Sequence, residues 1–106
     1  MREKKRYLAF EIVSKSKIED FKAVSGQIKA SVVAFLGELE TAKAGLIVMG
    51  DKWSTQAQKG VIKIKHRHVN PVMASLALID NMANRKVMVR SLGVSGTLKK
   101  SEGYLT

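Results

Sequence analysis

The 106-residue sequence contains no cysteine, only one proline and few aromatic residues, and its acidic side chains are outnumbered by basic ones. Without cysteine the chain can form no disulfide and has no thiolate chemistry, which fits the cytoplasm, where we expect it to act. The longest segment without Lys, Arg, Asp or Glu is residues 68–79, much shorter than the roughly 20 apolar residues that span a membrane. The charged start, MREKKR, predicts no signal peptide. Disulfide-stabilised, secreted and membrane-spanning classes are therefore disfavoured.

The charge that is present has one dominant sign. Nineteen Lys and Arg against nine Asp and Glu give a net charge of +10, which in a small protein predicts a polyanionic partner, either nucleic acid or an anionic membrane surface. An apolar content of 45% predicts a folded core. We therefore expect one folded domain over residues 1–106, with a basic N-terminal lead-in and a basic C-terminal tail.

Residues 60–67 (GVIKIKHR) alternate in character. Ile62, Ile64 and His66 fall on one face, and the other face carries Lys63, Lys65 and Arg67. This period of two predicts a half-buried strand with one core side and one cationic side. A row of like charges on a sheet destabilises it unless water or a polyanion covers the row.

The segments before this strand predict a strand, a helix and a second strand. Residues 6–14 alternate, and Ser16 with Glu19 has the spacing of a capping box that would begin a helix. Apolar residues then recur at intervals of three and four up to Gly37, which is a typical helix end. The apolar run 44–51 predicts the second strand, which a polar turn at 53–59 joins to the next one.

The segments after it predict a second helix and a fourth strand. Asn70 followed by Pro71 is typical of a helix start, and we expect this helix to continue to about Ala83. Residues 85–92 alternate again, and the glycine-rich, basic tail 93–100 is expected to form a loop with a little extra structure at its end. The element order is therefore β-α-β-β-α-β.

This order predicts an α+β ferredoxin-like sandwich, a four-stranded antiparallel sheet with two helices on one face and the first and third strands in the centre. The residues expected to face the helices are Leu8, Phe10, Ile12, Ile62, Ile64, Val87 and Val89. Those expected on the open face are Tyr7, Ala9, Glu11, Lys63, Lys65, Met88 and Arg90.

Nine basic residues fall between positions 59 and 100, where only Asp80 opposes them, and this asymmetry favours RNA binding over a merely solvated surface. The third strand lacks the aromatic residues that stack bases in RNA-recognition motifs, and only Tyr7 could stack on the open face. We therefore predict recognition of phosphates and shape. The candidate contacts are Lys63, Lys65, Arg67 and Arg90 on the sheet, and Lys4, Lys5, Lys99 and Lys100 as flexible phosphate contacts.

No catalytic or metal-binding constellation is found. His66 and His68, at i and i+2 with no carboxylate or cysteine nearby in sequence, are a poor ligand set. Glu11 and Asp51 have no adjacent nucleophile or base. An acylphosphatase-like enzyme would need a phosphate-binding loop with glycine and arginine after the first strand, and residues 14–16 (SKS) have neither. We expect no catalysis by this chain alone, and no cofactor or metal bound by it.

The predicted second helix contains no Lys or Arg and is apolar nearly all round. A helix packed on one side of a sheet needs only one apolar stripe. The apolar residues of this helix outside that stripe are therefore a candidate surface for a protein partner. Deep burial under the first helix would explain the same pattern. The candidate partner-binding residues are Met73, Ala77, Leu78 and Met82.

Five segments together resemble archaeal ribonuclease P protein component 2. They are residues 4–10 (KKRYLAF), 36–39 (LGEL), 44–49 (AGLIVM), 60–62 (GVI) and 92–98 (LGVSGTL). The resemblance covers nearly the whole chain and is most specific at the opening and closing segments. It adds Arg6, Tyr7, Gly96 and Thr97 as candidates for RNA-binding or structural roles, and it implies the same β-α-β-β-α-β fold.

The resemblance implies a subunit of the ribonuclease P ribonucleoprotein, in which the RNA removes the 5′ leader of precursor tRNA with magnesium bound on the RNA. Its implied partners are the ribonuclease P RNA, protein component 3 and, through the complex, precursor tRNA. A ribosomal protein or another RNA-binding module of similar topology is the nearest alternative. A small-molecule regulatory domain is a further one, although the excess positive charge argues against it.

Overall fold

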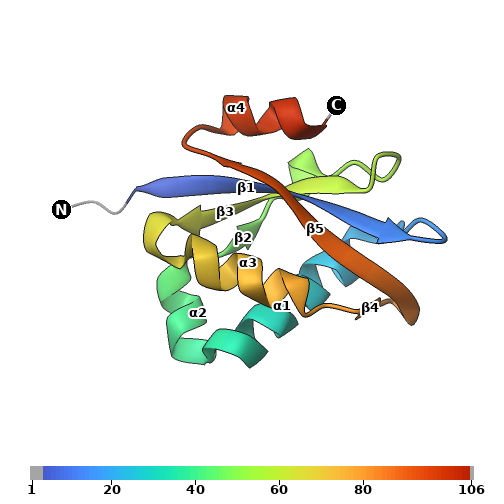
Figure 1. Cartoon of the computed structure of the whole chain (residues 1–106), viewed down its shortest axis with the longest axis horizontal. Coiled ribbons are helices and arrows are strands. Elements are labelled where there is room, and N and C mark those ends of the chain that lie inside the picture. The colour runs from blue at the N-terminus through green and yellow to red at the C-terminus, as the bar shows by residue number, and fades with distance from the viewer. Residues whose placement is uncertain (1–3, 106) are drawn as a thin grey trace.

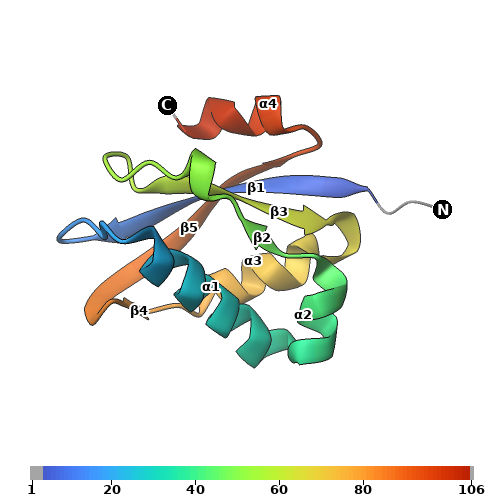
Figure 2. The same cartoon turned by 180° about the vertical axis from the view of Figure 1, so that it is seen from behind.

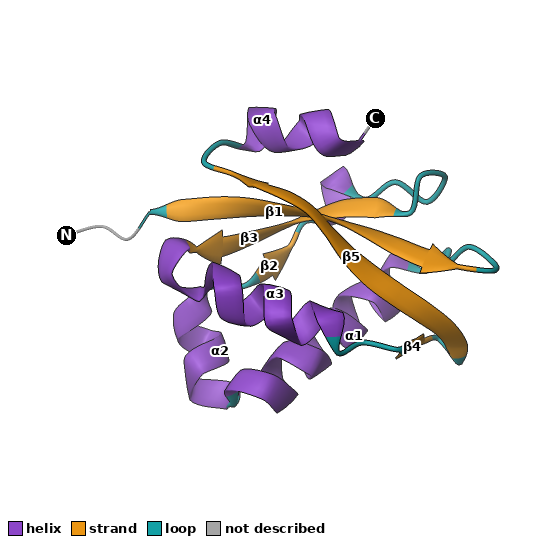
Figure 3. Cartoon of the chain, viewed as in Figure 1, coloured by secondary structure: helices purple, strands orange, loops and turns teal. Residues whose placement is uncertain are grey.

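The computed structural model describes residues 4–105. It contains a five-stranded antiparallel sheet with helices on both faces (Figures 1 and 3). The strands are β1 (Lys5–Ser14), β2 (Ile47–Val48), β3 (Lys59–Lys65), β4 (Asn81–Met82) and β5 (Arg85–Ser95). The helices are α1 (Phe21–Leu36), α2 (Glu38–Ala44), α3 (Val69–Ala77) and α4 (Leu98–Glu102), with short 3₁₀ turns η1 (Gly50–Lys52), η2 (His66–His68) and η3 (Gly103–Leu105). The strand order is β2-β3-β1-β5-β4, so β1 and β3, the predicted first and third strands, lie in the interior of the sheet as predicted, and β5 is interior as well because β4 lies at its edge.

The core lies between the sheet and the helices α1 and α3. Helices α1, α2 and α3 lie on one side of the sheet and α4 lies on the other (Figures 1 and 2). The alternation of β1 and β3 places Leu8 and Phe10 beside Ile62 and Ile64 in the core, as predicted. One stripe of α1 completes it, because Val24, Ile28 and Val32 are all buried. Burial of this single apolar layer is the main driving force for the fold.

Helix α1 begins at a different residue from the one predicted. The Asp20 carboxylate is the N-cap and accepts a hydrogen bond from the Lys22 backbone N–H at 2.9 Å, so the predicted capping box at Ser16 is wrong. A distant side chain explains the difference. The Gln58 amide donates to the Ile18 carbonyl at 3.0 Å and accepts from the Ile18 N–H at 2.9 Å, which uses the backbone groups that a helix there would need.

The end of α1 at Gly37 is confirmed. Gly37 has φ +87° and donates its N–H to the Val33 carbonyl at 2.7 Å. The chain then enters the short helix α2, which the sequence pattern did not predict.

The sheet has a fifth strand because the second helix is shorter than predicted. Helix α3 begins after His68 rather than at Asn70 and ends at Ala77. Residues Asn81 and Met82 then form β4, which pairs with the start of β5 through Ala83 and Asn84. These two residues have φ of +53° and +60°, the conformation of a two-residue type I′ hairpin turn. The prediction of a four-stranded sheet is therefore wrong in its strand number.

The face of the sheet opposite α1 is partly covered. The tail was expected to be a loop with a little extra structure at its end, but β5 continues to Ser95 and α4 follows it. Helix α4 crosses β1 and β5 on that face (Figure 1). Ala9, predicted on the open face, is consequently buried, and so is its neighbour across the strand pair, Val61. Only the two ends of this face remain accessible.

Among residues 4–105, no helix has both the length and the apolar character needed to cross a membrane.

Candidate nucleic-acid interface

The strand register gathers predicted RNA-binding residues at one end of the uncovered sheet face. Lys5 lies opposite Lys65, and Tyr7 lies opposite Lys63 on one side and Ser95 on the other. We call Lys5, Tyr7, Lys63 and Lys65 the basic sheet end. Like charges directly opposite each other destabilise a strand pair, so this arrangement favours a bound anion.

The turn after β5 leads into α4, which carries two more basic residues on the same face of the sheet (Figure 1). Gly96 and Thr97 form the turn, and the Thr97 hydroxyl caps α4 by accepting from the Lys100 N–H at 3.3 Å. Lys99 and Lys100 are therefore exposed on a helix rather than on a flexible tail. The helix is held at its other end by an ion pair of 3.8 Å between Lys52 Nζ and Glu102 Oε1.

Arg90 lies at the opposite end of the same face. It is next to Glu11 in the register, and its guanidinium donates to the Glu11 carboxylate. Glu11 and Tyr7 are four residues apart on β1, a separation of about 13 Å. The structure therefore separates Arg90 from the basic sheet end and gives it an acidic partner.

Arg67, predicted on the cationic face of the strand, lies beyond it. The strand ends at Lys65 and the chain turns into η2, because the His66 N–H donates to the Lys4 carbonyl at 2.7 Å. Side chains alternate along β1, so Arg6 points to the same face as Leu8 and Phe10. This is the face that carries α1, α2 and α3, which we call the helix side. Arg6 and Arg67 both line a hollow at this end of the molecule. The lead-in residues 1–3 lie outside the described residues.

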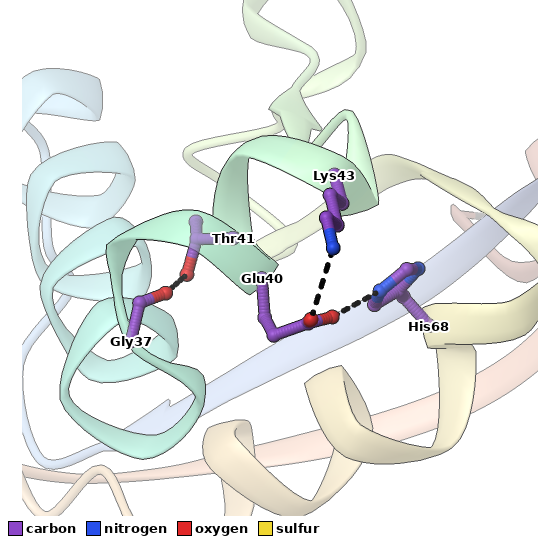
Figure 4. Close-up of polar contacts among 5 residues, drawn as sticks. All are labelled: Gly37, Glu40, Thr41, Lys43 and His68. Atoms are coloured by element: carbon purple, nitrogen blue, oxygen red, sulfur yellow. Dashed lines mark hydrogen bonds and ion pairs between the residues drawn. The ribbon is translucent and has the colours of Figure 1, made fainter.

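A contact that the sequence did not predict joins α2 to the segment before α3 (Figure 4). Glu40 Oε2 lies 3.2 Å from His68 Nε2, and Glu40 Oε1 lies 3.6 Å from Lys43 Nζ. The hydrogen bond from His68 and then the charge of Lys43 hold the pKa of Glu40 below its ordinary value. On the same helix, the Thr41 hydroxyl donates to the Gly37 carbonyl at 2.7 Å. Twenty-eight residues separate Glu40 from His68, so no local pattern could have indicated the pair.

The four predicted partner-binding residues divide between core and surface. Met82 is fully buried and Met73 packs against the core, so the expectation that Met82 is accessible is wrong. Leu78 is 63% exposed and Ala77 is also exposed. Leu78 lines a groove between α1 and the segment 78–81 that follows α3, together with Phe35 of α1, which the sequence analysis did not single out.

Within residues 4–105, no three His, Asp or Glu side chains come together as a metal-ion site would require.

Comparison with known proteins identifies the family. The model of the Rpp14/Pop5 family matches residues 6–106. The chain belongs to the Rpp14/Pop5 family. The resemblance found in the sequence is thereby confirmed, since curated relatives named "Ribonuclease P protein component 2" also match.

These relatives of the Rpp14/Pop5 chain come from archaea. The Pyrococcus furiosus protein is 35% identical over 100 residues, covering 94% of this chain and 81% of that protein. The Methanosarcina mazei protein is 33% identical, covering 95% and 83%. The Methanocaldococcus jannaschii protein is 32% identical, covering 96% and 72%.

The fold of the family member also occurs in a solved structure. A chain in the cryo-EM structure of yeast ribonuclease MRP superposes with a TM-score of 0.66 at 11% identity, covering 99% of this chain and 88% of that chain. At this identity the likeness establishes the α+β fold.

Proposed function

We propose that this chain is a non-catalytic protein subunit of ribonuclease P, the ribonucleoprotein that removes the 5′ leader of precursor tRNA. The observation that carries the proposal is its match, over 94% of its length, to a relative named "Ribonuclease P protein component 2". The cationic surface at Lys5, Lys63 and Lys65 agrees with such a role, because a subunit that holds a folded RNA needs to neutralise phosphates.

The proposed mechanism is electrostatic. Lysines at the basic sheet end and on α4 contact backbone phosphates, and the aromatic ring of Tyr7 lies among the lysines of the basic sheet end. Neutralising phosphates lowers the repulsion that opposes a compact RNA, so the RNA needs less magnesium to reach its active form. Magnesium stays on the RNA, and the chain itself supplies no catalytic group and no cofactor.

A protein partner is also part of the proposal. Leu78, Ala77 and Phe35 expose apolar surface on the helix side, away from the basic sheet end. We assign this surface to ribonuclease P protein component 3, within a cytoplasmic complex that binds precursor tRNA. An apolar patch opposite a cationic face lets one small subunit contact protein and RNA at the same time.

The test is cleavage of precursor tRNA by the ribonuclease P RNA at low magnesium, with and without this chain and component 3. We expect stimulation that needs both proteins. A folded, soluble pair that gives no stimulation would contradict the proposal. In the same assay, Lys63→Glu with Lys65→Glu tests the cationic face. The matched control for its change of charge is Lys22→Glu with Lys29→Glu, since both residues are exposed on α1.

A further inference from the structure

The hollow that Arg6 and Arg67 share lies on the helix side of the sheet, next to the basic sheet end but separate from it. It has a volume of about 300 Å³ and is lined by Arg6, His66, Arg67, Val69, Asn70 and Val94. Three separate segments supply these residues: β1, the stretch from η2 into the start of α3, and β5. We propose that this hollow is a binding site for one RNA phosphate group.

The donors that line the hollow fit a phosphate. The two guanidinium groups present planar N–H donors that match phosphate oxygens, and the His66 ring adds at least one further N–H. The Asn70 side-chain amide can donate as well. The six lining residues that the structure describes include no acidic side chain.

The walls of the hollow are fixed by contacts outside it. The His66 N–H donates to the Lys4 carbonyl at 2.7 Å, which ties η2 to the start of β1. Arg6 Nη1 donates to the Lys5 carbonyl at 3.0 Å, and this bond orients its guanidinium. Val69 is buried and so anchors the segment that carries Asn70. A site held in this way loses little freedom on binding its ligand.

The size and lining favour a phosphate over a base. The volume lies at the low end of the roughly 300–1,000 Å³ of small-molecule sites. Most of the lining is cationic or polar and only Val69 and Val94 are apolar, so it offers phosphate oxygens several N–H donors and a base little apolar surface. The hollow therefore reads the RNA backbone, and it fits either an internal phosphodiester or a terminal phosphate.

The inference rests on the proposed function only for the source of the phosphate. NMR spectra of the ¹⁵N-labelled full chain, recorded during titration with inorganic phosphate, test the site without RNA. We expect saturable shifts at the amides of Arg67, Val69 and Asn70. The double variant Arg6→Gln with Arg67→Gln should abolish them, and Lys22→Gln with Lys29→Gln, which removes the same charge elsewhere, should preserve them. Arg67→Gln alone, at an exposed position, provides a milder variant if the double variant does not fold.

A second titration uses short oligouridylates with a 5′-phosphate or a 5′-hydroxyl. Equal shifts at the hollow would assign it to an internal phosphodiester, and shifts only with the phosphorylated strand would assign it to a terminal phosphate. The double variant neutralises one or two fewer phosphates. The slope of log affinity for RNA against log salt concentration should therefore be smaller in magnitude by about one to two. Weak shifts that do not saturate and spread over all the lysines would overturn the site.

The two proposals fail in different ways. A chain that binds ribonuclease P RNA but shows no saturable shift at the hollow would lose the phosphate site and keep its proposed function. A chain that binds inorganic phosphate at the hollow but not the RNA would keep the site and lose the proposed function.

Discussion

Tyr104 of η3 lies directly on Gly93 of β5, at the place where a side chain on the strand would otherwise stand. The contact holds the C-terminal segment, including α4 with its exposed Lys99 and Lys100, on the face of the sheet that carries the basic sheet end. One glycine thus allows a helix to cover part of a face that the strand pattern predicts to be open.

Gly93→Ala should displace the Tyr104 ring and loosen α4, because the new methyl group would overlap the ring. We expect a loss of about 1–3 kcal/mol in the free energy of unfolding and faster hydrogen exchange at Ser101, measured by chemical denaturation and NMR. Gly96→Ala is the control, since its nearest neighbour would be Arg6 Nη1 at 3.8 Å. Equal effects of the two substitutions would contradict this role of Gly93.

Lys63→Glu with Lys65→Glu should weaken binding to ribonuclease P RNA and leave the fold intact. Both side chains lie on the outer face of β3, so neither substitution alters the core. The slope of log affinity against log salt should fall by about two, one for each phosphate that the variant no longer neutralises. Filter binding over a salt series measures it, with Lys22→Glu and Lys29→Glu as the control. Unchanged binding at moderate salt would remove the sheet face from the proposed interface.

Arg90→Ala should affect RNA binding less than Lys63→Glu with Lys65→Glu does. Arg90 lies at the far end of the sheet and donates to Glu11, so its charge is already partly compensated. As an exposed pair, the two residues should contribute about 0.2–1 kcal/mol to stability. A double-mutant cycle with Glu11→Ala measures the coupling. RNA binding reduced as strongly as by the lysine variant would place Arg90 in the interface after all.

Leu78→Ser and Met82→Ala should have opposite consequences. Leu78 is largely exposed, so Leu78→Ser should leave stability within about 0.5 kcal/mol and weaken association with component 3. Met82→Ala removes a fully buried side chain and should cost about 2–5 kcal/mol. Thermal unfolding and calorimetric titration with component 3 measure the two effects. Unaltered association of Leu78→Ser would argue against the helix-side docking surface.

The Glu40 contact should make a small pH-dependent contribution to stability. Because the pKa of Glu40 is lower in the folded chain, this contribution is complete above the ordinary glutamate pKa of about 4.3 and is lost as pH falls through the lowered value. NMR titration of the Glu40 carboxyl carbon measures the pKa directly. His68→Leu should raise it more than Lys43→Met does, since the His68 hydrogen bond is the larger cause. A larger effect of Lys43→Met would contradict this order.

The central sheet and the core follow from local patterns in the chain. Alternation in β1, β3 and β5 predicts which side chains are buried, because side chains on a strand point to opposite faces and only one face is covered by α1 and α3. The end of α1 at Gly37 was also predictable, since a helix end of this kind favours glycine locally. The excess of basic residues over 59–100 likewise indicates a polyanionic partner from composition alone.

The remaining elements depend on contacts between residues that are distant in the chain. Gln58 bonds the backbone of Ile18 and keeps it out of a helix, and Tyr104 on Gly93 holds α4 against the sheet. The same applies to the charges. Strand register brings Lys5 to Lys65 and Arg90 to Glu11. The turn after β3 brings Arg67 to the hollow that Arg6 also lines. Local sequence patterns predict which face of a strand or helix a residue lies on. A binding site combines residues from segments that are distant in the chain, and tertiary packing decides which of these segments lie next to each other.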